Sequence, residues 1–225
     1  MGSKIIKKKL WFSFKKQKVI PGKVPDIATQ LDFIEDYKVS LKDAQDSKIH
    51  ILFYDPVHQL HNSEAGKCWI EKWTEVFLKS NTWRKRITAM WGINPINLRF
   101  SGLIIEDNCD TETTKAALEI IREDYPDGKP IFIFLDNAAY NRSYEVQNHA
   151  LTLWITLSYL PPYSPNLNLI ERLRKFMKIK LVKNKYYETL DEFRSVFLSF
   201  FSNLWNYFDE LQKIFDNKFQ ILKAV

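Results

Sequence analysis

The sequence predicts an α/β fold in which a mixed β-sheet carries helices on both faces. Short runs rich in β-branched and aromatic residues alternate with stretches whose apolar residues have helical spacing. Two runs, at 86–93 and 98–105, are joined by the turn sequence Asn-Pro-Ile-Asn and predict a hairpin. Two later runs, at 131–135 and 155–160, are separated by a helical stretch, as in strand-helix-strand units. A hairpin followed by such a unit gives a sheet with both parallel and antiparallel strands.

The first helix and the first strand are expected before residue 55. Apolar residues recur every three or four positions from residue 27 to about residue 46, which predicts one amphipathic helix. The apolar run at 49–54 predicts a strand that Asp55 closes. The segment 56–80 mixes histidines, a glycine, two tryptophans and alternating charges, so we expect a long irregular connection with at most a short turn of helix.

Four helices are expected after the hairpin, because apolar residues at helical spacing recur there. The Pro-Asp-Gly sequence at 126–128 ends the first of them. An apolar stripe that reaches Phe208 gives the last of them a broad apolar face, which we expect in the core, with a subunit interface as the alternative. The four helices are predicted at 111–124, at 143–149, from Glu171 onward, and behind a capping box formed by Thr189 and Glu192.

Length and composition restrict the class of protein. A chain of 225 residues with 45% hydrophobic residues can bury one substantial core. No apolar run approaches the roughly 18 residues of a membrane helix, and the Lys-rich start lacks the apolar segment of a secretory signal. We therefore expect a cytoplasmic protein without a membrane partner. Cys68 and Cys109 have no CxxC partner, so we expect small buried side chains rather than a zinc site or a disulfide.

Two basic blocks favour binding to a polyanion. The net charge is +6, and residues 1–24 hold eight lysines without an acidic residue. Residues 172–187 hold seven basic residues, again without an acidic one. Either block alone would more often be a solvated tail or helix face, but the second directly follows Glu171, which favours contact with nucleic acid. The candidate DNA-binding residues in it are Arg172, Arg174, Lys175 and Lys178.

Three carboxylates stand at the ends of buried segments. Asp55 follows the first strand, Asp136 follows the run at 131–135, and Glu171 opens a helix after the run that ends at 161–162 in two prolines. Because the C-terminal ends of strands and the first turns of helices meet at one edge of a doubly covered sheet, we expect these side chains to lie together. Carboxylates are the ligands that hard cations prefer, and two such ions about 4 Å apart compensate charge on the attacking and leaving oxygens of a phosphodiester.

Other interpretations of these residues stay open. The two aspartates also suit turns that follow strands, and Glu171 suits the positive end of a helix. His58, His61 and Glu64 form a second set at helical spacing, for which surface or packed histidines are the better interpretation. The chain has six glycines, no Gly-rich phosphate loop and no GxSxG sequence, so nucleotide hydrolysis and serine hydrolase chemistry have little support.

Two sequence motifs carry a family resemblance, namely LDNAAYNRS at 135–143 and YLPPYSPNLNLIE at 159–171. They resemble the catalytic-domain signature of bacterial insertion-sequence transposases related to mariner elements, which are DDE superfamily endonucleases with an RNase H-like core. The resemblance reaches from about residue 10 to residue 201, and the 34 residues between Asp136 and Glu171 match the spacing of the Asp-Asp-Glu subgroup. Three residues depart from the family's pattern, which usually has proline, tryptophan and histidine in place of Leu169, Arg174 and Asn141.

The resemblance implies a domain organisation and a site. It implies a basic arm and lead-in helix at 1–46, and an RNase H-like catalytic domain at 47–225 with a helical C-terminal part. The N-terminal helix-turn-helix region of the family is expected to be absent. By resemblance, Asp55 bridges two Mg²⁺ or Mn²⁺ ions, while Asp136 and Glu171 each complete one.

The resemblance also implies an activity and partners. The activity is metal-dependent cleavage and strand transfer of double-stranded DNA. The DNA partners are transposon ends and a target, and a homodimer is one possible assembly. The first alternative is a catalytically inactive, nucleic-acid-binding remnant of a truncated transposase. The second alternative is an RNase H-like nuclease of another lineage that acts on RNA/DNA hybrids.

Overall fold

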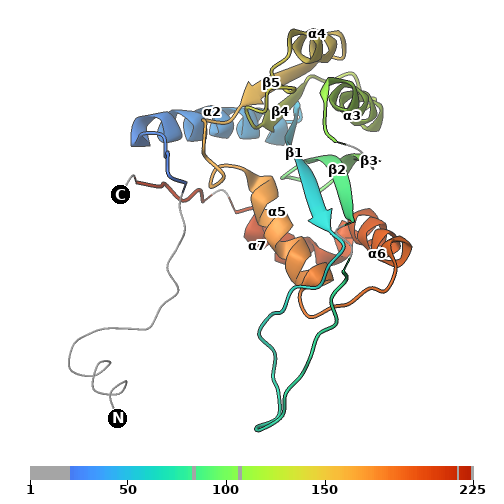
Figure 1. Cartoon of the computed structure of the whole chain (residues 1–225). Coiled ribbons are helices and arrows are strands. Elements are labelled where there is room, and N and C mark those ends of the chain that lie inside the picture. Colours follow the sequence, from blue (N-terminus) through green and yellow to red (C-terminus); the bar gives the residue numbers. More distant parts are fainter. Residues whose placement is uncertain (1–20, 83–84, 106–107, 217, 224–225) are drawn as a thin grey trace, which may run out of the picture.

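The computed structural model describes residues 21–82, 85–105, 108–216 and 218–223, and its centre is a five-stranded sheet in the order β3-β2-β1-β4-β5 (Figure 1). The first three strands are antiparallel, whereas β1, β4 and β5 are parallel. The predicted mixed sheet is therefore confirmed. The strands are β1 (His50–Leu60), β2 (Arg86–Ile93), β3 (Phe100–Ile105), β4 (Ile131–Leu135) and β5 (Ile155–Tyr159).

The helices cover both faces of this sheet (Figure 1). Two of them, α3 (Thr111–Asp124) and α4 (Tyr144–Thr152), pack on one face. Apolar side chains of the first helix and of the C-terminal helices share the cluster on the other face. Helices on that second face are α2 (Ile27–Gln45), α5 (Leu169–Met177), α6 (Leu190–Ser202) and α7 (Phe208–Ile214), together with a π-helical turn at Lys178–Val182 and a 3₁₀ turn at Leu204–Tyr207.

The register of β1 and β4 decides which side chains face the second layer of helices. Phe53 is paired with Phe134 across these two parallel strands, and their rings stack with centroids 5.1 Å apart. Both rings belong to the apolar cluster that includes α5 and α6. Because successive side chains of a strand point to opposite faces, residues two positions further on, Asp55 and Asp136, are directed to the same face.

Polar side chains at the start of each longer helix explain where these helices begin. Each cap accepts a hydrogen bond from a backbone N–H of the first turn, which would otherwise lack a partner. The predicted capping by Thr189 is confirmed, since its side chain accepts from the N–H of Glu192, while the Glu192 carboxylate accepts from the N–H of Glu188. The five capping residues are Asp26, Asp110, Ser143, Asn168 and Thr189.

The first strand is longer than the sequence predicted, because β1 does not end before Asp55 but continues through Pro56 to Leu60. Its pairing with β4 stops at Tyr54, whereas its pairing with β2 continues to Leu60. Proline has no backbone N–H to donate to a neighbouring strand, so it is tolerated best where a strand has only one neighbour. Beyond Tyr54 only β2 flanks β1, and Pro56 lies in this part of the strand. Asp55 thus lies inside a strand, at the point where the parallel part of the sheet ends.

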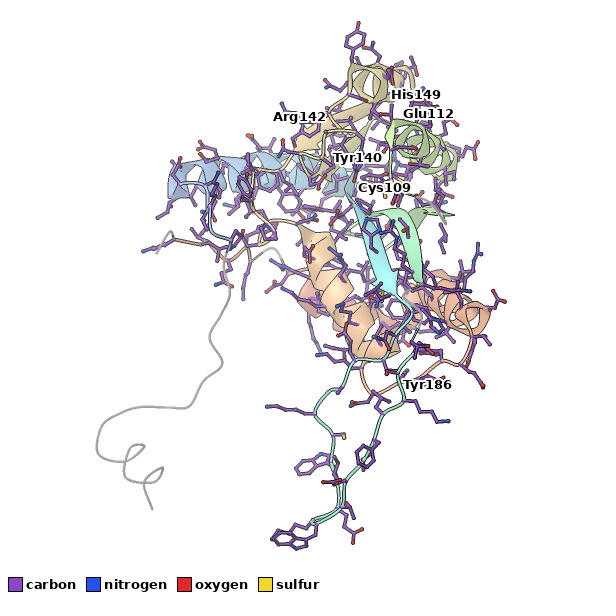
Figure 2. The ribbon with its side chains drawn as sticks, viewed as in Figure 1. Cys109, Glu112, Tyr140, Arg142, His149 and Tyr186 are labelled. Carbon is purple, nitrogen blue, oxygen red and sulfur yellow. The ribbon has the colours of Figure 1, made fainter. Side chains whose placement is uncertain are left out.

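The connection between β1 and β2 protrudes from the body of the molecule (Figure 1). Its base is held by the segment after α5, since the N–H of Gly66 donates to Asn184 Oδ1 at 2.7 Å and Asn81 Nδ2 donates to the carbonyl of Tyr187 at 3.1 Å. The amino group of Lys79 also lies 5.8 Å from the ring centre of Tyr186 (Figure 2). Between residues 61 and 82 the described chain contains no helix, as expected for an irregular connection.

The protruding connection corrects one expectation about the cysteines. Cys68 lies on it and is exposed, whereas Cys109 is partly buried, and both are free thiols. A cysteine side chain is buried only where the surrounding chain packs against the core, and the protruding connection does not pack against the core.

The last third of the chain is helical, and the part of its aromatic stripe on α6 is core, whereas Trp205, beyond the end of α6, is 70% exposed. Phe193, Phe197, Phe200 and Phe201 are buried in the cluster beneath Trp91, as expected. The helix predicted to open at Glu171 begins two residues earlier, at Leu169, because Asn168 rather than a later residue caps it.

The basic arm at the N-terminus lies outside the described residues, apart from residues 21–24. Among the helices in the described part of the chain, none has the length and apolar character that crossing a bilayer requires.

Candidate active site

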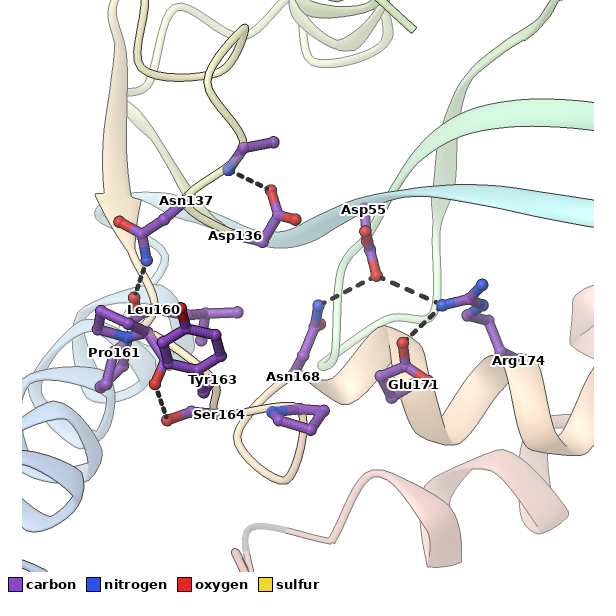
Figure 3. A pocket seen from close by; sticks show the side chains of 13 residues that line it. Asp55, Asp136, Asn137, Leu160, Pro161, Tyr163, Ser164, Asn168, Glu171 and Arg174 are labelled. Carbon is purple, nitrogen blue, oxygen red and sulfur yellow. Dashed lines mark hydrogen bonds and ion pairs between the residues drawn. The ribbon is translucent and has the colours of Figure 1, made fainter. Parts of the chain in front are cut away.

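The three carboxylates predicted from the sequence line one cavity of about 520 Å³ (Figure 3). Asp55 comes from β1, Asp136 directly follows β4, and Glu171 lies in the first turn of α5. The register of β1 and β4 directs the two aspartates toward the face that α5 covers, and α5 packs against β1. Proline and tyrosine residues of the 160–165 segment close the cavity on its other side.

Asn168 connects the start of α5 to the strand beneath it. Its Oδ1 accepts a hydrogen bond from the N–H of Ile170 at 3.1 Å, which caps the helix. Its Nδ2 donates to Asp55 Oδ2 at 3.3 Å, and both residues are buried. One side chain therefore fixes the helix that carries Glu171 relative to Asp55. Asn168 was not among the residues expected at the site, although an asparagine directly before an apolar helical run is a signal for a helix cap.

Asp136 is held by the loop that follows it. Its Oδ1 accepts hydrogen bonds from the N–H of Ala138 at 3.1 Å and from Asn141 Nδ2 at 2.8 Å. Asn141 is fully buried. The side chain of Asn137 points the other way and donates to the carbonyl of Leu160, which ties the ends of β4 and β5 together (Figure 3). The orientation of the Asp136 carboxylate is therefore set by neighbouring residues.

The guanidinium of Arg174 lies between the other two carboxylates (Figure 3). Its Nη1 donates to Glu171 Oε1 at 2.6 Å and lies 4.0 Å from Asp55 Oδ2. Arg174 follows Glu171 by three residues on α5, which puts the two side chains on one side of the helix.

The electrostatics of the cavity centre on Asp55. Burial raises the pKa of Asp55 to about 7, the Arg174 guanidinium opposes this rise, and the charges of Asp136 and Glu171 add to it. Three carboxylates in one partly dehydrated cavity repel one another, which is the physical cause of the last contribution. A site with this charge distribution favours binding of a cation.

The residue types fit a hard divalent cation, since carboxylate oxygens are the ligands that Mg²⁺ and Mn²⁺ prefer. In the described ranges, however, no group of three or more His, Cys, Asp or Glu side chains is arranged to hold an ion. Arg174 instead offsets part of the negative charge near Asp55 and Glu171.

The four basic residues predicted to contact DNA have different surroundings. Arg172 donates from Nη1 and Nη2 to the carbonyls of Ile214, Asp216 and Lys218, and so anchors the C-terminal segment. Arg174 contacts the carboxylates, and Lys178 forms an ion pair with Glu64 at 2.8 Å.

Lys175 makes no ion pair with any residue that the structure describes. It lines a second cavity of about 600 Å³ next to the first, together with Lys218, which the sequence analysis did not single out. Glu171 lines both cavities, so the basic surface continues directly from the carboxylates.

The second candidate set of ligands does not come together. His58 Nδ1 lies 3.1 Å from Thr88 Oγ1 on the neighbouring strand. His61 is buried, its ring stacks on Phe193 and its Nε2 lies 2.9 Å from the carbonyl of Tyr187. Glu64 pairs with Lys178. The packed interpretation is therefore correct for His61.

Known proteins match this chain in sequence and in structure. Residues 50–194 match the family model described as DDE superfamily endonuclease. An uncharacterized protein of Sinorhizobium fredii, y4pE/y4sA, is 30% identical over 92 residues, which cover 41% of this chain and 65% of that protein. The chain therefore matches less than two thirds of this relative's length.

Solved structures share the fold. The Mos1 transposase paired-end complex with the left transposon end matches with a TM-score of 0.68 and 12% identity, over 95% of this chain and 67% of that one. The catalytic domain of Mos1 mariner transposase matches with a TM-score of 0.57 and 12% identity, over 88% of this chain and 94% of that one. The RNase H-like architecture expected from the resemblance is thus confirmed, and the chain belongs to the DDE superfamily endonucleases.

Proposed function

We propose that this chain is the catalytic domain of a transposase and that it cleaves DNA phosphodiester bonds in a metal-dependent reaction, followed by strand transfer. The observation that supports this most is the meeting of Asp55, Asp136 and Glu171, from three separate elements, at one cavity. Family membership supports the same chemistry. The experiment that tests it is the conversion of supercoiled plasmid to nicked circle in the presence of Mg²⁺ or Mn²⁺.

We propose that the three carboxylates hold the metal, as two ions. Bound divalent cations would supply Lewis-acid stabilisation of the attacking and leaving oxygens of the phosphodiester. Asn168 and Asn141 keep Asp55 and Asp136 oriented toward the cavity, so the ligands are positioned before an ion arrives. Solved Mos1 paired-end complexes with Mn and with Mg support the choice of ion.

We propose that double-stranded DNA lies across the second cavity, with Lys175 and Lys218 next to its phosphates. Both line this cavity beside Glu171. Lysine binds phosphate as a point charge without reading the base sequence. Such a surface would hold transposon ends and target DNA alike. Since DNA is the proposed substrate, we also propose the cytoplasm as the place of action.

Neutralising Lys175 is expected to weaken DNA binding and its dependence on salt. For one phosphate contact, Lys175→Gln should reduce the log–log slope of affinity against salt by about 0.9. The loss should be similar for unrelated duplex sequences, because phosphate contacts carry no sequence information. Fluorescence anisotropy of labelled duplexes at several salt concentrations measures both the affinity and its dependence on salt. Lys115→Gln on α3, on the other face of the sheet, is the matched control and should leave the slope unchanged. An unchanged slope for Lys175→Gln would exclude this contact.

We propose that the chain pairs with a second copy through the connection between β1 and β2. Trp69, Trp73 and Phe77 on it are almost fully exposed, with relative exposures of 104%, 96% and 86%. Several large exposed aromatic side chains on one segment are typical of an interface. The Mos1 paired-end complexes favour a second copy as the partner.

Light scattering is expected to show a concentration-dependent dimer that Trp69→Ser and Trp73→Ser together abolish. Tyr144→Ser, which removes an exposed aromatic residue of α4, should leave the dimer intact. A monomer at every concentration, or a dimer that survives the double substitution, would contradict the proposal.

The inactive remnant remains the second candidate, and the position of Arg174 favours it, because an arginine already forms ion pairs with two of the three carboxylates. Metal binding without any DNA cleavage would support this candidate over the enzyme.

We propose the domain boundaries expected from the resemblance, with the catalytic domain at 47–225 and the lead-in helix α2 before it. Buried residues of α2, such as Phe33 and Tyr37, pack against Phe134 of β4. The lead-in helix is thus held on the proposed domain by its apolar face.

A further inference from the structure

We propose that Arg174 is an internal counter-ion that competes with a divalent cation for Asp55 and Glu171, so that it lowers the affinity of the site for metal. This inference rests on the proposed function, because it assumes that the carboxylates are metal ligands. It assigns to Arg174 a role in the cavity in place of the DNA contact expected from the sequence.

The contacts place Arg174 on the oxygen atoms that an ion would need. One guanidinium nitrogen, Nη1, is 2.6 Å from Glu171 Oε1 and 4.0 Å from Asp55 Oδ2. The Asp55 side chain is only 12% exposed, so it is screened little by solvent. Both contacts arise within a cavity that Asp136 also lines.

The competition follows from the chemistry of the two cations. A guanidinium stays charged at any pH the protein experiences, so it cannot be displaced by losing its proton. Its charge compensates the repulsion among the carboxylates, as a metal would. Glu171 Oε1 accepts a short hydrogen bond from Arg174, so an ion that approaches this oxygen from the same side, toward Asp55, must displace the guanidinium. The conformation without this contact is the one that can bind metal, and it is a minor one. The free energy needed to reach it reduces the apparent affinity for metal.

The side chain of Arg174 has room to move away from the carboxylates. Its side chain is 30% exposed, and it lines the open cavity rather than the core. A rotation of the side chain is therefore enough to release Glu171, without a change in the fold.

Isothermal titration of the DNA-free protein with MnCl₂ tests the competition. Arg174→Gln is expected to bind Mn²⁺ about tenfold more tightly than the wild type, the effect of removing one charge-assisted hydrogen bond. Arg174→Lys retains a cation and should stay within a few-fold of the wild type. Lys115→Gln is the matched control, because it removes the same charge from α3, on the other face of the sheet, far from Asp55 and Glu171. Its affinity for Mn²⁺ should remain near that of the wild type.

Thermal unfolding without metal provides a second readout. Arg174→Gln should melt at a lower temperature than the wild type, because the carboxylates lose their counter-ion, and it should gain more from added Mn²⁺. A side chain that only supports the fold would lower the melting temperature without any change in metal affinity.

A measurement on the wild type keeps the test valid if Arg174→Gln does not fold. The Nε–Hε NMR signal of Arg174, identified by its absence in Arg174→Lys, is expected to shift as Mg²⁺ is added. A signal that stays in place while Mg²⁺ binds would overturn the inference.

The outcomes separate this inference from the proposed function. In one outcome, Arg174→Gln binds Mn²⁺ no more tightly than the wild type, while Asp136→Asn does not bind it. This outcome would overturn the role of Arg174 but would still support the metal site. No Mn²⁺ binding by the wild type, by Arg174→Gln or by Asp136→Asn would overturn both.

Discussion

Mn²⁺ is expected to raise the melting temperature of the wild-type protein by roughly 5 to 10 °C when its concentration reaches 100 times the dissociation constant. Ligand at that concentration stabilises the folded state by about 2.7 kcal/mol, and 1 kcal/mol corresponds to about 2 to 4 °C for a chain of this size. The physical cause is the group of three carboxylates, whose mutual repulsion contributes to the raised pKa of Asp55. Differential scanning fluorimetry over a metal titration measures the shift.

The same metal should raise the melting temperature of Asp136→Asn much less than that of the wild type. The substitution removes a ligand and one negative charge, so without metal the variant should be as stable as the wild type or more stable. The asparagine can still accept hydrogen bonds from Ala138 and Asn141 through its Oδ1, so the loop should keep its conformation. Asp32→Asn on the exposed side of α2 is the matched control and should show the full shift. Equal stabilisation of Asp136→Asn and the wild type would contradict the assignment of the site.

Replacing any one of the three carboxylates is expected to remove nearly all cleavage of DNA. We expect Asp55→Asn, Asp136→Asn and Glu171→Gln each to lower the cleavage rate by at least about 10³-fold, since residues that act as a unit fail together. That factor corresponds to about 4 kcal/mol of lost transition-state stabilisation. A double variant should be little worse than a single one, because the first substitution already disables the site. Additive losses of a few-fold each would indicate side chains that assist the reaction separately.

Most of the sheet could be predicted because its strands obey local rules. The runs that became β2 and β4 are rich in apolar and β-branched residues, and the polar residues Asn94 and Asp136 follow them, so their ends coincide with the predicted ones. The end of β1 could not be predicted in this way. A proline inside a strand argues against a strand by local rules, and only the partner strands show that β1 loses one neighbour before Pro56.

The meeting of the three carboxylates at one cavity could be predicted because each marks an end or an edge of the sheet's parallel part. Asp55 and Asp136 follow the last residue pair that joins β1 and β4, and Glu171 lies in the first turn of a capped helix. The contacts of Arg174 were not predictable from these patterns. Its spacing from Glu171 indicates one contact, but the approach to Asp55 joins residues far apart in the chain and depends on how α5 packs on β1. A basic block in the sequence therefore suggested a DNA contact where the structure has an ion pair within the cavity.

The central claim is that the three carboxylates form one metal-dependent site that cuts DNA. Nicking of supercoiled plasmid across an Mn²⁺ titration, with wild type, Asp136→Asn and Asp32→Asn purified in parallel, tests it most directly. We expect nicked circles from the wild type and from Asp32→Asn over the metal concentrations that stabilise each protein, and none above background from Asp136→Asn. Nicking by Asp136→Asn at the wild-type rate, or no nicking by a wild type that binds Mn²⁺, would contradict it.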